Sequence, residues 1–206
     1  MHVLLINGSP HEKGCTYTAL SLVAGELNAA GITTEILNVG TKPVGGCIGC
    51  GGCAKGNGCV FGGVVNEAIE KARTADAFVF GTPVHYASAS GNMTSFMDRL
   101  AYAGGKYLAY KPAAICASAR RAGTTAALDQ LAKYPEFFHM PLVSGSYWPM
   151  VHGSNPEQVL QDEEGCAVMK ELGRNMAWLL QCIEAGKAAG ISHPENPRRP
   201  MTNFIR

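Results

Sequence analysis

The sequence predicts an α/β fold with a five-stranded, doubly wound parallel sheet, and two observations lead to this prediction. Five short apolar runs, most of them ended by glycine or proline, have the composition of strands that are buried on both faces. Helical patterns lie between these runs and after the last one, so that strands and helices alternate along the chain. Such alternation is typical of a parallel sheet with helices on both faces.

The first half of the chain is expected to contribute three strands and three helices. The strands are expected at residues 2–7, 33–39 and 77–83, where β-branched, leucine and phenylalanine side chains precede turn residues. The helices are expected at residues 16–30, 64–73 and 90–103. The first of them has apolar side chains at helical spacing and is followed by Gly31, a favourable residue at a helix C-terminus.

The second half of the chain continues the same pattern. Strands are expected at residues 112–119 and 141–148, and helices at residues 124–139 and 156–187. Pro135 is expected to end or kink the first of these two helices, because proline cannot donate the backbone hydrogen bond. The second helix has its leucine, valine and methionine side chains on one side, which would pack against the sheet.

The composition is that of one compact domain with ample apolar side chains for a core. The chain has 206 residues, of which 47% are hydrophobic and 16% charged, and its formal net charge is +1. Nucleic acid and anionic membranes are therefore not expected as partners, because no basic field would attract them. No apolar stretch reaches the ~18 residues of a membrane helix, and no signal peptide is apparent, so a cytoplasmic location is expected.

The last residues differ in composition from the rest of the chain. Residues 1–190 are expected to form the domain, and residues 191–206, with three prolines and three arginines, to form a tail that is neither helix nor strand. Such a tail would pack along its own subunit or fray. Because Phe204 and Ile205 are apolar, anchoring on a neighbouring subunit is the alternative.

The turn that follows the first strand has features of a phosphate site. Ligands of open parallel sheets bind outside the carboxyl ends of the strands. The turn GSPHEKGCT, residues 8–16, lacks both the G-x-G-x-x-G pattern and the Lys-Ser/Thr ending of nucleotide loops. It offers glycine together with the hydroxyls of Ser9, Thr16 and Thr18 near the free amides of the following helix. This combination suits one terminal phosphate, although an ordinary capped turn would have similar residues.

Two later turns would complete a pocket at the same edge. In residues 81–92, Pro83 and the glycines restrict the backbone, and His85 and Tyr86 place flat side chains where a ring could rest. In residues 118–125, two arginines precede a Gly-Thr-Thr helix start. An ordinary surface histidine and solvated loop arginines are the alternative interpretations.

The three turns together, GSP-x-x-x-G-x-T, TPVHY and RRAGTT, resemble the flavodoxin-like NAD(P)H-dependent FMN reductase family over essentially the whole chain. The resemblance implies strand order 2-1-3-4-5 and FMN at the carboxyl edge. It also implies that the phosphate, the isoalloxazine and its border are contacted by Ser9, His11, Cys15, Thr16 and Thr18, by Pro83, Val84, His85 and Tyr86, and by Ser118, Arg120, Arg121 and Gly123, respectively. His11 and Cys15 stand where relatives usually have arginine and asparagine, so these two positions offer fewer donors.

A cysteine-rich segment follows the second predicted strand. Cys47, Cys50, Cys53 and Cys59 have the spacing C-x2-C-x2-C-x5-C, which would bring all four ligands of one cluster from a single loop. Zinc sites usually pair two C-x2-C units across a longer gap. The segment resembles that of the iron-sulfur flavoproteins, which carry a [4Fe-4S] cluster. A cluster is therefore favoured, while zinc, a regulatory disulfide and no ligand remain open.

The other cysteines are expected to have different roles. Cys116, Cys166 and Cys182 occupy apolar strand or helix positions and are expected to be small core residues. Cys15 lies beside a helix start, where the pKa of a thiol can fall.

Three functional hypotheses follow. The first is an enzyme, an FMN-dependent NAD(P)H oxidoreductase that reduces flavin, quinone or another small acceptor, with no side chain nominated as catalytic acid or base. The second is an iron-sulfur flavoprotein that carries electrons from a ferredoxin-like partner, and the third is a non-catalytic flavin-binding module that senses redox state. A homodimer or homotetramer is expected, because a flavin at the rim of a sheet has one open side.

Overall fold

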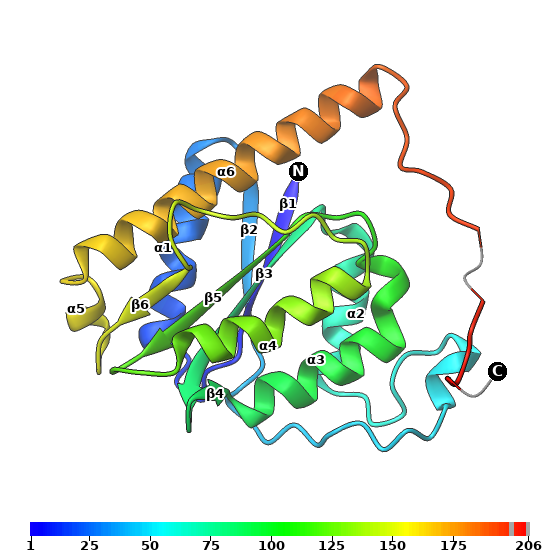
Figure 1. Cartoon of the computed structure of the whole chain (residues 1–206), viewed down its shortest axis with the longest axis horizontal. Helices are drawn as coiled ribbons and strands as arrows, with labels where there is room; N and C mark the ends of the chain where they lie inside the picture. Colours follow the sequence, from blue (N-terminus) through cyan, green and yellow to red (C-terminus); the bar gives the residue numbers. More distant parts are fainter. Residues whose placement is uncertain (198–199, 205–206) are drawn as a thin grey trace.

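The protein forms one sheet of parallel strands with helices on both faces, as the computed structural model of residues 1–197 and 200–204 shows (Figure 1). The strand order is β2-β1-β3-β5-β6, and every neighbouring pair along it is parallel. These strands are β1 His2–Asn7, β2 Thr33–Asn38, β3 Ala77–His85, β5 Ala113–Ala119 and β6 Met150–His152. Numbered among themselves, they have the order 2-1-3-4-5, so the predicted flavodoxin-like fold is confirmed.

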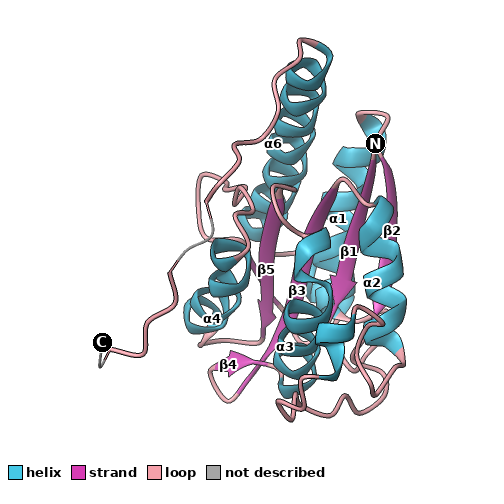
Figure 2. Ribbon diagram, turned by 90° about the vertical axis from the view of Figure 1, so that its right-hand side faces the viewer, coloured by secondary structure: helices cyan, strands magenta, loops and turns pink. Residues whose placement is uncertain are grey.

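The helices divide into two layers that bury the two faces of the sheet (Figure 2). One layer consists of α1 Cys15–Ala29 and α6 Glu163–Ala188, and the other of α2 Val64–Thr74, α3 Gly91–Gly104 and α4 Thr124–Phe137. Pro135 lies in the last turn of α4, where the helix ends soon afterwards. Short 3-10 helices η1 Gly52–Lys55 and η2 Gly105–Tyr107 lie outside this arrangement. The carboxyl edge of the sheet is left free for loops.

The fifth parallel strand is not where the sequence predicts it. Residues 141–148 are mostly loop and contribute one isolated bridge, Leu142 with Ala113, whereas β6 pairs with β5. The first residues of this loop stay bonded to β5, where Ala113 N donates to Pro141 O at 2.9 Å and Val143 N donates to Ala113 O at 2.8 Å, and later residues contact α6. Glu171 accepts hydrogen bonds from the backbone N–H of Ser146 at 3.0 Å and from its hydroxyl at 2.6 Å. The prediction of strand 141–148 is therefore wrong by several positions.

The predicted last helix, residues 156–187, is two helices in the structure. A single turn, α5 Pro156–Val159, precedes α6, and Asp162 lies between them as the N-terminal cap of α6. Its carboxylate accepts hydrogen bonds from the N–H of Gly165 at 2.9 Å and from the N–H of His152 at 2.7 Å. The break therefore joins the start of α6 to the end of β6.

The tail leaves α6 as an extended, exposed segment whose end projects away from the rest of the subunit (Figure 2). The ring of His193 stacks on the ring of Tyr110 with centroids 4.4 Å apart. Residues 198–199 and 205–206 lie outside the described residues, and with them the predicted role of Ile205. Anchoring on a neighbouring subunit stays a prediction. In the part of the chain that the structure describes, no helix is long and apolar enough to cross a membrane.

Candidate functional site

Three loops meet at the carboxyl edge of the sheet, as the sequence predicts. The loop after β1 is joined to the middle of β3 by a hydrogen bond from Gly8 N to Gly81 O at 2.9 Å. The hydroxyls of Thr16 and Ser118 lie 2.7 Å apart, which joins the start of α1 to the end of β5. These contacts hold segments that are far apart in the sequence in one continuous rim.

The loop after β1 leaves backbone amides free at the start of α1. The N-terminal cap is Gly14, no side chain caps the helix, and its first turn contains no acidic residue. The backbone N–H of His11 donates to the hydroxyl oxygen of Ser9 at 3.1 Å, so the loop curls around the Ser9 side chain. An uncapped helix start of this kind is suited to bind an anion.

Three other predicted residues at the start of α1 have side-chain partners within the protein: Thr16, Thr18 and Cys15. Thr16 is fully buried with its hydroxyl on Ser118, and Thr18 donates its hydroxyl hydrogen back to Gly14 O at 3.1 Å. His11 is exposed. The Cys15 thiol donates to Gly153 O at 3.5 Å, and burial raises the pKa of this thiol more than its backbone hydrogen bond lowers it. The expectation of a lowered pKa at Cys15 is therefore wrong.

The second loop is a hairpin rather than an open turn. Strand β3 continues through Pro83 and Val84 to His85, and β4 Ser88–Ala89 pairs with its end in the antiparallel direction. The two residues between the strands, Tyr86 and Ala87, have φ angles of 50° and 59°. A two-residue hairpin turn of this type needs positive φ at both positions, and residues other than glycine adopt it only at some energetic cost. Tyr86 is fully exposed at the tip.

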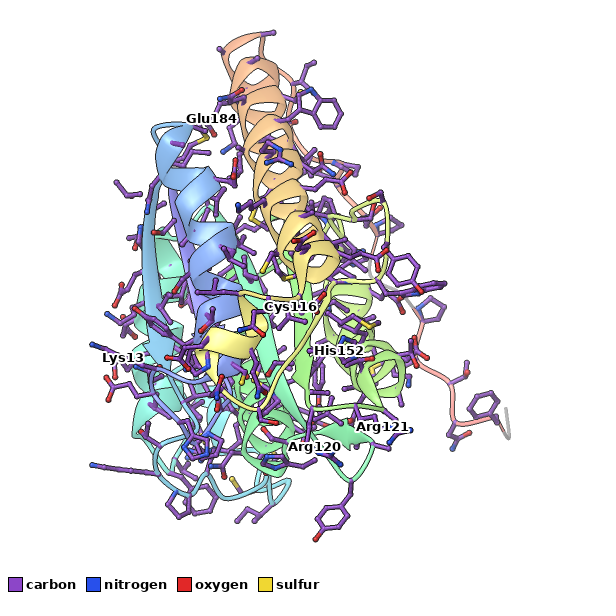
Figure 3. All side chains as sticks on the ribbon, turned by 90° about the vertical axis from the view of Figure 1, so that its left-hand side faces the viewer. Lys13, Cys116, Arg120, Arg121, His152 and Glu184 are labelled. Atoms are coloured by element: carbon purple, nitrogen blue, oxygen red, sulfur yellow. The ribbon has the colours of Figure 1, made fainter. Side chains whose placement is uncertain are left out.

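The third loop packs directly against this hairpin. Gly123 has a φ of 100°, and a Cβ atom added to it would lie 2.5 Å from the Cα of Ala87. Only glycine allows this approach. Arg120 and Arg121 are exposed and extend from the same end of the sheet (Figure 3). The structure thus brings the hairpin, the two arginines and the start of α1 to one rim.

The link between Thr16 and Ser118 yields a first prediction. Thr16→Val should lower the free energy of unfolding by about 1–3 kcal/mol, because it leaves a buried hydroxyl on Ser118 without its partner. Urea unfolding followed by circular dichroism measures this. Thr33→Val is the matched control, since its hydroxyl is exposed and should change stability by less than about 0.5 kcal/mol. Equal effects in the two variants would contradict the prediction.

The cysteine segment forms a second candidate site. Cys47, Cys50, Cys53 and Cys59 line a single cavity of about 220 Å³, and none of the four is in a disulfide. Cys53 lies in η1, and Cys59 is fixed to α2 because its N–H donates to the Asn66 side chain at 2.8 Å. Within residues 1–197 and 200–204, no three His, Cys, Asp or Glu side chains are already gathered to hold one metal ion.

Helix α3 holds the segment that leads to this cavity. Near its start, Asn92 accepts from Val44 N at 3.1 Å and donates to Gly40 O at 3.0 Å. Two turns later, Arg99 reaches Gly45 and Cys59. Seven residues of helix span about 10 Å, so the cavity is displaced from the hairpin along α3. Figure 1 shows the chain running from β2 to η1, away from β4. The sequence predicts that the whole loop after β2, with its four cysteines, lies at the carboxyl edge of the sheet. In the structure, only the first residues of that loop lie there.

Comparison with known proteins identifies the family. The model of the NADPH-dependent FMN reductase family matches residues 1–155. The chain belongs to this family. An iron-sulfur flavoprotein of Methanocaldococcus jannaschii is 26% identical over 193 residues, which are 89% of this chain and 100% of the relative. An iron-sulfur flavoprotein of Archaeoglobus fulgidus is 30% identical over 175 residues, which are 83% and 86% of the two chains.

Solved structures agree with the fold of the FMN reductase family. A flavone reductase superposes with a TM-score of 0.66 at 16% identity, covering 89% of this chain and 64% of that one. An NADH:FMN oxidoreductase has a TM-score of 0.61 at 20% identity, covering 88% and 89%. A flavodoxin from the domain Archaea has a TM-score of 0.60 at 13% identity, covering 88% and 99%. At these identities the likeness concerns the fold.

Two residues of the three-loop rim at the carboxyl edge of the sheet were not predicted from the sequence. Asn7, at the end of β1, is fully buried and accepts from Ser9 N at 3.1 Å, while its amide donates to Asn38 Oδ1 at 2.8 Å. His152 ends β6 next to Ala119, at the same end of the sheet as Arg120 (Figure 3). His152 was missed because the strand was predicted too early. The signal was the short apolar run before Gly153, which resembles the other strand ends.

Two core predictions for the remaining cysteines also need correction. Cys116 is buried, and burial raises the pKa of its thiol to about 12, as expected of an inert core thiol. Cys166 is only half-buried, and Cys182 is exposed on α6. Their positions in α6 are apolar in pattern, but the helix packs on the sheet through other positions.

Proposed function

We propose that this chain is an oxidoreductase that binds FMN at the three-loop rim and accepts electrons from NAD(P)H. The observation that carries the proposal is the uncapped start of α1, which lies at the carboxyl edge of the sheet without an acidic residue in its first turn. An anionic phosphate is favoured there by the free amides and the helix dipole. The family match over residues 1–155 supports the same ligand.

The chain's own residues have distinct roles in this proposal. Ser9, His11 and the amides of Cys15 and Thr16 would hold the phosphate. The hairpin residues Pro83 to Tyr86 and the loop Ser118 to Gly123 would border the ring. Their packing keeps this wall rigid, since Gly123 lies against Ala87 and the Ser118 hydroxyl is held by Thr16. Bound FMN would supply the redox chemistry, accepting electrons in pairs and releasing them singly.

The electron donor decides between the enzyme and the alternatives. Anaerobic mixing of the FMN-loaded protein with NADH or NADPH should bleach the flavin's visible absorbance, and an added quinone or free flavin should restore it. Absence of bleaching with either nicotinamide would contradict the proposed activity. Bleaching by reduced ferredoxin alone would support the electron carrier. If neither a nicotinamide nor ferredoxin reduced the flavin, the non-catalytic redox-sensing module would remain.

The electron carrier is a second candidate because the four cysteines border one cavity. Single tetrahedral ions need their ligands close together, whereas a cluster separates its ligands by the width of the cluster. The four thiols come from one loop with the spacing C-x2-C-x2-C-x5-C and line one cavity, which favours a [4Fe-4S] cluster over zinc, whose sites usually pair two C-x2-C units across a longer gap. The names of the two archaeal relatives support this assignment. A homodimer or homotetramer, and a ferredoxin-like partner, stay predictions.

A further inference from the structure

Helix α3 carries a buried cation that faces the cysteine cavity. Arg99 is only 6% exposed, although it is an arginine in the middle of an amphipathic helix. Its Nε donates to Cys59 Sγ at 3.2 Å, and its two terminal nitrogens donate to Gly45 O at 3.3 Å and Gly62 O at 3.1 Å. The guanidinium also lies 5.3 Å from the centre of the Phe61 ring. Arg99 thus contacts both ends of the cysteine segment.

No carboxylate of residues 1–197 and 200–204 forms an ion pair with this charge. Among the described residues, Lys71, Arg73, Arg174 and Lys187 form ion pairs with glutamates, whereas Arg99 forms none. Burial of an unpaired charge is costly, and arginine cannot lower that cost by releasing its proton. The groups next to Arg99 that can carry negative charge are the cysteine sulfurs of the cavity, which Arg99 itself helps to line. The buried charge is therefore explained if those sulfurs are anionic.

We propose that Arg99 sets the reduction potential of an iron-sulfur cluster held by Cys47, Cys50, Cys53 and Cys59. This inference rests on the proposed cluster. Reduction adds an electron to a site whose sulfurs are already negative, so a nearby positive charge and an N–H···S hydrogen bond favour the reduced state. Arg99 supplies both, through Nε at Cys59. It acts through the ligands and is a positioning and tuning residue.

A purely structural role for Arg99 makes a different prediction. The two bonds to Gly45 O and Gly62 O would close the loop whether or not a cluster is bound. Loss of such a clamp would lower cluster loading or stability, and it would leave the potential of any loaded cluster unchanged. The potential therefore separates the two roles.

The experiment compares anaerobically reconstituted wild type with Arg99→Gln and Arg99→Lys. Iron and acid-labile sulfide are counted first, and redox titration followed by electron paramagnetic resonance then gives the cluster potential. Arg99→Gln should shift the one-electron reduction equilibrium about tenfold toward the oxidised cluster, equivalent to about 59 mV more negative. Arg99→Lys, which keeps the charge, should shift less. Arg174→Gln removes the same charge at the surface and should leave the potential unchanged.

Each outcome bears on the proposal. A fully loaded Arg99→Gln protein with the wild-type potential would overturn it. If Arg99→Gln does not load, loading of Arg99→Lys near the wild-type potential supports the charge, and failure of both variants assigns Arg99 to the clamp alone and overturns the tuning role. Wild type that binds neither iron nor sulfide overturns the cluster itself and this inference with it. None of these outcomes changes the result of the flavin reduction experiment, so failure of the cluster proposal is distinguishable from failure of the proposed FMN function.

Discussion

Gly40→Ala is expected to lower the affinity for FMN on the order of a hundredfold, equivalent to about 2.7 kcal/mol of binding free energy. Gly40 follows β2 and packs against the loop after β1, so a Cβ atom there would lie 2.6 Å from Gly8 O and closer still to the carbonyl of Ser9. Both are backbone atoms of the proposed phosphate loop. They cannot rotate out of the way as a side chain would, so the loop itself must move.

The displacement should impair binding more than folding. Overpacking of this kind typically costs about 1–3 kcal/mol, which is less than the stability of an ordinary domain. Binding of the phosphate, by contrast, depends on amides held within a few tenths of an ångström. Titration of apo-protein with FMN, followed by quenching of flavin fluorescence, measures the affinity, and thermal unfolding checks the fold.

Gly25→Ala is the matched control for this substitution. Gly25 lies within α1, and a Cβ atom there would meet no other atom within 4 Å. This change should leave FMN affinity unaltered and stabilise the helix by about 0.5–1 kcal/mol, because alanine favours the helical state. If folded Gly40→Ala protein bound FMN as tightly as Gly25→Ala, the phosphate could not lie at the loop after β1.

Most of the sheet could be predicted because burial on both faces leaves a local signature. Strands β1 and β5 are almost uninterrupted runs of buried residues, and β3 is buried over its first six positions. Such strands need continuous apolar sequence, which is visible without any knowledge of their neighbours. The loops at the carboxyl ends of these strands could be predicted as well. Once the strands are known to be parallel, their carboxyl ends must lie at the same edge of the sheet.

Features that depend on contacts distant in sequence could not be predicted. Residues 141–148 have a composition suited to a strand, but Glu171, 25 positions after Ser146, binds the loop instead. Thr16 looked like a phosphate ligand, yet its hydroxyl pairs with Ser118, 102 positions away. The sequence led to no prediction for Arg99, because its contacts involve Cys59, 40 positions earlier. Local patterns carry no information about such partners.

Cys53→Ser is expected to remove iron and acid-labile sulfide from the protein while leaving FMN bound. Cys53 lies in η1 and lines the cavity together with the other three cysteines. Serine has the same side-chain shape as cysteine with a smaller oxygen in place of sulfur, and it is not a thiolate ligand, so the cluster would lose one of its four attachments. The loss should not reach the flavin rim, because the cavity is displaced from that rim along α3.

Iron, zinc and sulfide counts after anaerobic reconstitution check this expectation, with flavin content measured on the same samples. Cys182→Ser is the matched control, since this thiol is exposed on α6 and lies outside the cavity. It should retain the wild-type iron content. If the wild-type protein contained zinc and no sulfide, the site would hold a single zinc ion and not a cluster. Equal iron and sulfide in Cys53→Ser and Cys182→Ser would show that the four cysteines do not act as one ligand set, because a four-ligand cluster cannot be indifferent to which thiol is removed.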